Sequence, residues 1–483
     1  MNMSLHNPIR FFSKNYFLLV FYLAMSVITL EAKTDWTILT YVQANNNLYP
    51  FSLKNFSDMA LIGSNENTTM LVQWFQQKHK GIWRYKVTKG KLELDECKPT
   101  ENSTGTSAEE LVDAMQWAVD KYPANKYSLV LWDHGLGIID PQWAGYRPAS
   151  SERLINSAMA ANNARIQIPG ITIAENVMDA AINEAAETLS NEIIHNAMSQ
   201  KESLMFANNI ATTLDSVISS TRGILFNEHS RTYMDNSTLV NALSTIKTKV
   251  LKNKKIDLLG MDACLMAMVE VGYLARDYAN ILVASQEVEL AHGWPYAAVM
   301  AALSEKNITP KRVAQSIVTV FETYYKDKIP FYTQSAIDLT CMNSLKTNLD
   351  TFALAFKACR TVDKNLMTSY ARSARNQTVQ FSSPGYVDLH SFFTELAKQI
   401  AQQIPTSSAL SRTRDIENLR IIIANGIKIV ENSVFAYAAG KTLARAKGLS
   451  IYFPTGFIDT SYPKNDFSRD CGWYGFIKDF ISG

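Results

Sequence analysis

The sequence predicts an α/β protein with a mainly parallel central sheet and helices on both of its faces. Three short apolar runs, at 127–132, 256–261 and 281–285, have the composition of strands that are buried on both sides. Stretches with helical periodicity alternate with these runs, and one of them opens with a capping box formed by Ser107 and Glu110. Strands that alternate with helices form βα units, which build parallel sheets.

Further elements extend this framework toward both ends of the chain. In the N-terminal part we expect a strand at 36–42, a turn at 45–47, a helix, a mildly amphipathic segment at 70–77 and a strand at 83–88. In the rest of the chain we expect helices at 265–278, 344–360, 389–403 and 412–432, and a strand at 449–453 that ends before Pro454.

The chain of 483 residues is long enough for about three folding units. We expect an α/β domain at 33–343, interrupted at about 140–222 by a helical insertion that is rich in Ala, Asn, Ser, Met and Glu. A mostly helical C-terminal region at 344–483 follows, and its strand at 449–453 is expected to return to the core. Connections as long as this insertion are uncommon and usually functional.

Residues 1–32 have the features of a secretory signal peptide. Arg10 and Lys14 precede an apolar run at 16–30, and Ala32 is a small residue suited to cleavage. The run is shorter than the roughly twenty residues that span a bilayer, which favours a signal over the alternative, a signal anchor. We therefore expect a secreted or periplasmic protein with no membrane attachment once the signal is removed.

The composition argues against several classes of function. The 47 basic and 45 acidic residues nearly balance, and no basic stripe suggests a nucleic-acid partner. The five cysteines show no C-x-x-C spacing, and the chain has no H-E-x-x-H motif and no compact cluster of metal ligands. We therefore expect no metal in the chemistry of this protein.

A histidine and a cysteine follow two of the buried strands. His134 and Gly135 come after the run at 127–132, and Asp262 and Cys264 come at the end of the run at 256–261. Catalytic groups gather at the carboxyl ends of parallel strands, so we expect His134 and Cys264 to lie close together. An imidazole and a helix start, expected at Cys264, both lower the pKa of a thiol. The backbone N–H groups of Gly135 and Cys264 are candidates for an oxyanion hole.

Each of these residues also has an inert interpretation. Cys264 alone fits a small core residue, and His134 alone fits a buried histidine with satisfied hydrogen bonds. Their joint position at adjacent strand ends favours the catalytic interpretation. His292 is the rival base, and Asp133 fits a structural hydrogen-bonding group better than a third catalytic residue.

These segments resemble the motifs of a known family. Leu131–Gly135 and Gly260–Met266 are similar to the His and Cys blocks of the clostripain family of cysteine peptidases, which is peptidase family C11 of the caspase-like clan CD. Four other segments, at 36–41, 285–296, 387–389 and 448–454, match in the expected order. The resemblance covers most of residues 36–460 and implies a caspase-like three-layer sandwich as the catalytic domain.

The resemblance implies an endopeptidase that cleaves peptide or protein substrates after Arg or Lys through a Cys264–His134 dyad and a thioester. It places Asp262 in the pocket for the basic side chain, because a partly desolvated carboxylate accepts a guanidinium in bidentate fashion. Further candidates for substrate binding are Glu287, Glu289, His292 and Trp294.

The resemblance leaves several properties open. It implies self-cleavage within the insertion, where the basic candidates are Arg147, Arg153, Arg165, Lys201 and Arg222. No cofactor is needed for the chemistry; calcium supports some relatives, but no D-x-D-x-D-G loop marks a site here. We expect a monomer. The alternative functions are a non-catalytic binding or adhesion protein on the same scaffold, and transpeptidation through the same thioester.

Overall fold

The structure, a computed structural model, describes residues 33–76, 79–100, 102–140, 223–383, 385–403 and 414–483. The predicted signal peptide at 1–32 and the predicted helical insertion, apart from Asp140, lie outside the described residues. Within the described part, no helix is both long enough and apolar enough to cross a lipid bilayer.

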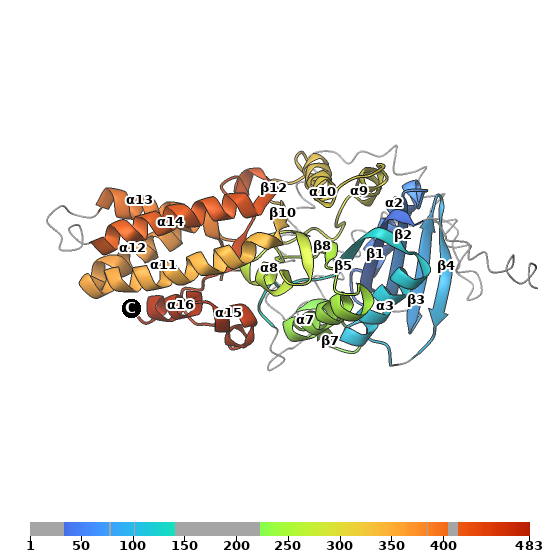
Figure 1. The fold of residues 1–483 in the computed structure, drawn as a ribbon, viewed down its shortest axis with the longest axis horizontal. Coiled ribbons are helices and arrows are strands. Elements are labelled where there is room, and N and C mark those ends of the chain that lie inside the picture. The colour runs from blue at the N-terminus through green and yellow to red at the C-terminus, as the bar shows by residue number, and fades with distance from the viewer. Residues whose placement is uncertain (1–32, 77–78, 101, 141–222, 384, 404–413) are drawn as a thin grey trace, which may run out of the picture.

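A nine-stranded mixed sheet forms the centre of the protein and confirms the predicted α/β class (Figure 1). Its strands, in spatial order, are β12 (Val434–Ala439), β10 (Thr333–Asp338), β9 (Ala279–Ala284), β8 (Ile256–Asp262), β5 (Ala124–Trp132), β1 (Thr34–Ala44), β2 (Thr68–Gln76), β3 (Ile82–Thr88) and β4 (Lys91–Lys98). The middle strands, from β9 to β2, are parallel, and antiparallel strands extend the sheet on both sides.

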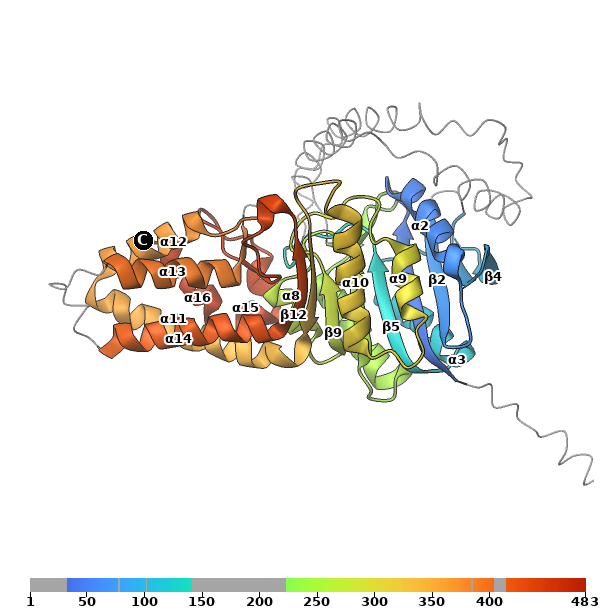
Figure 2. The same cartoon turned by 90° about the horizontal axis from the view of Figure 1, so that it is seen from above.

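Helices cover both faces of this sheet and complete three layers (Figure 2). On one face lie α2 (Tyr49–Ile62), α9 (Tyr296–Leu303) and α10 (Pro310–Tyr325), and on the other lie α3 (Ala108–Lys121), α7 (Asn236–Thr245) and α8 (Val269–Ala275). A π-helical turn at Ile246–Val250 continues α7, and a small hairpin is formed by β6 (Ile224–Asn227) and β7 (Thr232–Met234). Alternate residues of β5 face opposite cores: Leu129 and Leu131 pack into one cluster, Val130 and Trp132 into the other.

The C-terminal region projects from the β12 edge of the sheet (Figure 1). It contains the long helices α11 (Met342–Val362), α12 (Lys364–Gln377), α13 (Leu389–Gln403) and α14 (Arg414–Ser433), and the short helices α15 (Asp466–Asp470) and α16 (Trp473–Ile481). Single 3₁₀ turns lie at Leu339–Cys341, Lys441–Leu443 and Tyr462–Lys464.

Three elements differ from the sequence-based expectations or were not predicted. The expected strand at 449–453 forms β13 (Ser450–Tyr452), which packs in the core but pairs with β11 (Tyr386–Asp388) in a separate two-stranded sheet. The C-terminal strand that joins the central sheet is β12, which was not predicted because it directly continues the helical pattern of α14. The described part of the segment at 70–77, residues 70–76, lies in β2, whose residues are all buried, so its pattern carries no helical face.

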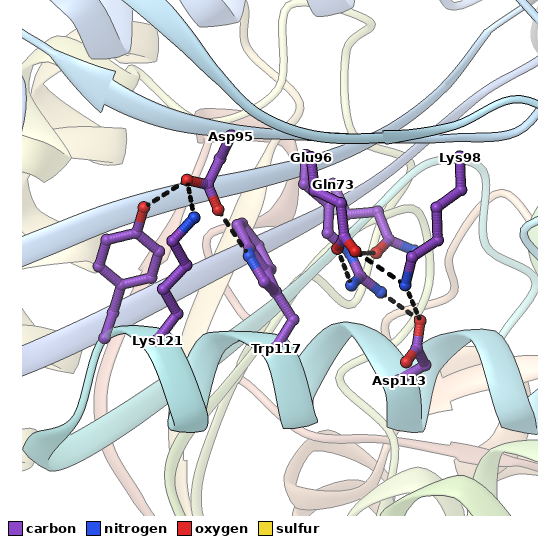
Figure 3. Close-up of polar contacts among 9 residues, drawn as sticks. Gln73, Asp95, Glu96, Lys98, Asp113, Trp117 and Lys121 are labelled. Atoms are coloured by element: carbon purple, nitrogen blue, oxygen red, sulfur yellow. Dashed lines mark hydrogen bonds and ion pairs between the residues drawn. The ribbon is translucent and has the colours of Figure 1, made fainter.

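A buried guanidinium fixes the outer strands of the sheet to α3. Arg84 on β3 is 1% exposed, and its two terminal nitrogens lie 2.5 Å from carboxylate oxygens of Glu96 and Asp113. Its Nε donates to Gln73, and its charge lies 5.2 Å from the centre of the Trp117 ring. Figure 3 shows the helix residues Asp113 and Trp117 turned toward the strands.

The same cluster continues along α3 in Figure 3 through Asp95 on β4. Its carboxylate accepts from Trp117 Nε1 at 2.8 Å and from Tyr122 Oη at 3.0 Å, and it pairs with Lys121. These contacts lower the pKa of Asp95 despite the opposing effect of its burial.

We expect Arg84→Met to destabilise the protein by about 2–3 kcal/mol. The substitution keeps the buried side-chain volume but leaves the carboxylates of Glu96 and Asp113 with Lys98 as their remaining cation, and both carboxylates are exposed enough to recover some hydration. Lys98→Met, at the exposed rim of the same cluster, should cost less than about 1 kcal/mol. Urea unfolding of both variants measures the difference, and equal effects would contradict a dominant role for the buried cation.

Candidate active site

The parallel pairing of β5 and β8 brings the two predicted catalytic residues to one edge of the sheet. Trp132 is paired with Asp262, and the N–H of Asp133 donates to the carbonyl oxygen of Asp262 at 3.3 Å. His134 and Cys264 each follow two residues after this last pair. The sheet register therefore places the imidazole and the thiol on adjacent chain segments, as the strand-end argument predicts.

His134 is 9% exposed, and its Nε2 lies 2.7 Å from Oδ1 of Asn47. Asn47 belongs to the turn after β1, which is the parallel neighbour of β5 on its other side. The sequence predicts a turn at 45–47, but nothing in the pattern of these three asparagines indicates a contact with His134. Only the strand order could have indicated this contact, because the turn follows a central parallel strand and so lies at the same edge of the sheet as His134.

Cys264 lies in a tight turn and does not begin a helix. Helix α8 starts at Val269, so the expected helix at 265–278 is wrong at its start, and with it the expected activation of the thiol by a helix terminus. Leu265 has a φ of 65°, a left-handed conformation that costs a residue with a side chain about 1–2 kcal/mol. The N–H of Leu265 donates to the carbonyl of Glu287, and the Cys264 thiol lies 3.7 Å from the carbonyl of Glu289.

Gly135 approaches the backbone of the nucleophile turn closely. A Cβ atom at this position would lie 2.5 Å from the carbonyl oxygen of Cys264 and 3.1 Å from the side chain of Ala263. Glycine is therefore required by space at this position. The close approach places the Gly135 backbone beside that of Cys264, as an oxyanion hole built from both N–H groups requires.

Asp262 and Glu289 form a buried acidic pair beneath Cys264. Asp262 is 4% exposed, and its Oδ2 accepts from the Trp294 N–H at 3.2 Å and from Tyr296 Oη at 2.8 Å. Glu289 accepts from Gln334 through Oε1, whereas its buried Oε2 meets no N–H or O–H donor among the described residues.

Burial disfavours the ionised form of both carboxyl groups. Burial, followed by the charge and hydrogen bonding of Asp262, holds the pKa of Glu289 well above its usual range. Burial also raises the pKa of Asp262, although the donors around it oppose this effect. Like-charged carboxylates in one site cannot both ionise readily, so we expect Glu289 to be the protonated member.

The other candidate substrate residues have side chains committed to packing or hydrogen bonding. The Glu287 carboxylate accepts from the N–H groups of Val288 and Ser382. Trp294 is 1% exposed and packs against Gly260 of β8.

His292 lies edge-on against Phe51, and burial together with the charges of Lys54 and Lys328 lowers its pKa to about 4. His292 is therefore neutral at pH 7 and a weak base, which favours His134 over its rival.

The loop that carries these residues is fixed at Gly293. Gly293 has a φ of 60°, and a Cβ atom there would lie 2.6 Å from Asp262 Oδ2. Its carbonyl accepts from Tyr325 Oη at 2.7 Å, and the carbonyl of His292 accepts from Asn55. The loop thus lies directly against Asp262 and is held there by the side chains of Tyr325 and Asn55.

The four other cysteines lie outside this site, on or next to β4, α11 and α15. All five cysteines are free thiols, and burial raises the pKa of Cys97, Cys359 and Cys471, which makes them poor nucleophiles. In the described part of the chain, no three His, Cys, Asp or Glu side chains are grouped so that they could hold a metal ion. The groups gathered at this edge are a thiol, an imidazole, backbone N–H groups and an acidic pair, and the first three suit acyl transfer.

Comparisons with known proteins agree with this geometry. A sequence model of the clostripain family matches residues 40–181 and 178–479. A search of curated proteins finds no match. Among solved structures, the secreted C11 cysteine protease "iotapain" from Bacteroides thetaiotaomicron is 15% identical, has a TM-score of 0.55 and covers 92% of this chain and 99% of its own.

Two further solved structures share the fold. An inactive zymogen of a C11 protease from Parabacteroides distasonis is 17% identical, with a TM-score of 0.53 and coverage of 92% of this chain and 99% of its own. A complex of a secreted C11 protease from Bacteroides thetaiotaomicron with an irreversible peptide inhibitor gives 15% identity, a TM-score of 0.53 and the same coverage. Since the family match spans most of the sequence and the fold agrees with it, the chain belongs to the clostripain family and is a cysteine endopeptidase.

Proposed function

We propose that the protein is an exported endopeptidase that cleaves after Arg or Lys, with Cys264 as nucleophile and His134 as general base. The observation that carries this proposal is the β5–β8 register, because Trp132 and Asp262 pair and His134 and Cys264 each follow two residues later. No cofactor takes part in the proposed steps.

The reaction proceeds through a thioester. The Cys264 thiolate attacks the carbonyl carbon of the scissile bond after His134 has taken the thiol proton. The N–H groups of Gly135 and Cys264 stabilise the oxyanion, and His134 returns its proton to the leaving amine. Water then enters, His134 takes one of its protons, and hydrolysis of the thioester releases the acid and regenerates the thiol.

Specificity for a basic side chain comes from Asp262 and Glu289. The two carboxyl groups lie close enough to raise the pKa of Glu289, so a guanidinium or ammonium group bound between them would supply the counter-charge that lets both ionise. An uncharged side chain leaves the buried pair unsatisfied, and such a mismatch discriminates strongly. Glu287, His292 and Trp294 act in this proposal as positioning residues that fix the loop around the pair.

Export and activation are part of the same proposal. The features of residues 1–32 support secretion, and a protein of the same fold is described as secreted. The basic residues within 140–222 support self-cleavage in the insertion, and another protein of this fold is described as an inactive zymogen. Calcium is proposed only as a modulator, to be varied in the assays below.

Turnover of fluorogenic peptides tests the activity. Peptides with Arg or Lys before the fluorescent amine should be cleaved at least about 10³-fold faster than matched Gln or Asp peptides. Cys264→Ala should lower kcat on the order of 10⁴-fold or more, because the nucleophile is lost. Cys341→Ala, a partly buried cysteine outside the site, should retain activity with and without calcium. Absence of turnover in every condition, also after tryptic nicking of the insertion, would favour the non-catalytic scaffold.

The acidic pair predicts a pH-dependent affinity for basic ligands. The raised pKa of Glu289 means that the pair gains its second charge only as the pH rises, so KM for an Arg peptide should fall with rising pH. Glu289→Gln should remove this dependence, and binding of argininamide to wild type should release up to about one proton. Calorimetry in buffers of different ionisation enthalpy measures the release. Asp277→Asn, at an exposed aspartate, serves as control, and a KM profile shared by wild type and Glu289→Gln would contradict the pair as the pocket.

Self-processing predicts a change of chain composition during activation. Wild-type protein should separate into two fragments on a denaturing gel, with the break after a basic residue in the insertion, while Cys264→Ala should remain intact. A fully active enzyme that stays a single chain would refute self-cleavage as a requirement. Mass spectrometry of the fragments identifies the bond.

A further inference from the structure

The side chain of Asn47 forms a hydrogen bond with one of the two ring nitrogens of His134. The distance from Asn47 Oδ1 to His134 Nε2 is 2.7 Å, within the range of a well-formed hydrogen bond. An amide oxygen only accepts, so with Oδ1 toward the ring Nε2 must carry the hydrogen. The neutral ring then has its lone pair on Nδ1, which is the nitrogen left to receive a proton.

The backbone that carries Asn47 is firmly held, because the preceding Asn46 is built into the same corner. Asn46 is 1% exposed, and its Nδ2 donates to Asp133 Oδ1 at 2.7 Å and to the carbonyl of Phe226 at 2.8 Å. Its Oδ1 accepts from the Leu48 N–H at 2.8 Å.

Asp133, the residue before His134, also accepts from the N–H of Phe226. Asn46 and Asp133 therefore connect the segment before Asn47 to the segment before His134. Asn46 precedes Asn47 and Asp133 precedes His134. Because Asn46 and Asp133 are hydrogen-bonded to each other and to Phe226, the relative position of Asn47 and His134 is fixed.

We propose that Asn47 is a positioning residue for the catalytic base: its side-chain oxygen selects the Nε2–H form of His134 and orients Nδ1 for the thiol of Cys264. This inference rests on the proposed function, in which His134 takes the thiol proton. The amide oxygen remains an acceptor when the ring becomes an imidazolium, since both ring nitrogens then carry hydrogens. Because the amide has no net charge, it fixes the ring throughout the cycle without holding the proton on it as a carboxylate would.

Two substitutions at Asn47 separate this role from simple packing. Asn47→Leu is close in size and removes the acceptor, whereas Asn47→Asp keeps an acceptor oxygen and adds a negative charge. Asn102→Leu, at an exposed asparagine, is the matched control. Two readouts are needed: kcat and KM on an Arg peptide, and the pH dependence of Cys264 alkylation by iodoacetamide, followed on the Cys264 peptide by mass spectrometry. The alkylation readout does not require turnover.

We expect Asn47→Leu to lower kcat by about 10–100-fold with KM within about twofold, because an unoriented base transfers the proton less often. Alkylation of Cys264 near neutral pH should slow in parallel. Asn47→Asp should recover kcat to within about tenfold of wild type and move the acidic limb of both pH profiles upward, because a carboxylate favours the imidazolium.

Three outcomes would overturn the inference. The first is wild-type kcat and alkylation in Asn47→Leu. The second is equal impairment of the Leu and Asp variants together with a lower thermal midpoint, which is the signature of a merely structural residue. The third is a loss of kcat in Asn47→Leu while the pH profile of Cys264 alkylation stays the same as in wild type. If wild type cleaves no basic peptide but its alkylation profile depends on Asn47, the proposed specificity fails and the inference stands.

Discussion

The pairing of Trp132 with Asp262 across two parallel strands is the constraint on which the rest of the site depends. Side chains alternate along a strand, so a shift of one residue in this register would turn the segments after β5 and β8 to the wrong faces. The same register determines that Gly135 meets the carbonyl of Cys264, where no larger residue fits. The core enforces the register, because Leu131 and Trp132 are buried in opposite hydrophobic clusters.

The C-terminal region belongs to the active-site scaffold even though its helices project away from the sheet. Gln286 donates to Asp388 at 3.0 Å and accepts from the N–H of Gly448 at 2.9 Å, and all three positions are buried. The backbone around Gln286 provides the carbonyls that meet Leu265 and Cys264. On the histidine side, Tyr386 donates to the carbonyl of Leu136, next to Gly135. Tyr386 therefore contacts the loop after β5 directly, and Asp388 and Gly448 support the loop after β8 through the segment that contains Gln286.

The sequence predicted what depends on local pattern and on strand order, and missed what depends on exact backbone paths. The strands around His134 and Cys264 and the capping box at Ser107 follow from composition and spacing, and the structure has them. The turn at Leu265 could not be foreseen, because a left-handed leucine has no sequence signature and is held by contacts from distant segments. The Asn47–His134 bond joins residues far apart in sequence, so only the folded chain reveals it.

Four buried acidic groups, at the candidate site and where the C-terminal region meets the core, reduce the stability of the fold at neutral pH. Burial is the largest cause of the raised pKa of Asp262, Glu289, Asp388 and Glu270, and for Glu270 it raises the pKa to about 7. A carboxyl group whose pKa is raised in the folded state destabilises the fold as the pH rises above its unfolded value, because ionisation is then disfavoured only in the folded chain. Glu270 offsets part of this cost by accepting the N–H of Tyr452, which joins the C-terminal region to the core. Asp388 accepts the N–H groups of Ser391 and Lys447 and the side-chain amide of Gln286. Glu270 and Glu289 each keep one buried carboxylate oxygen without a donor among the described residues, and Glu289 differs from Glu270 in lying beside a second carboxyl group, that of Asp262. In the proposed function, a basic side chain supplies the counter-charge of this pair.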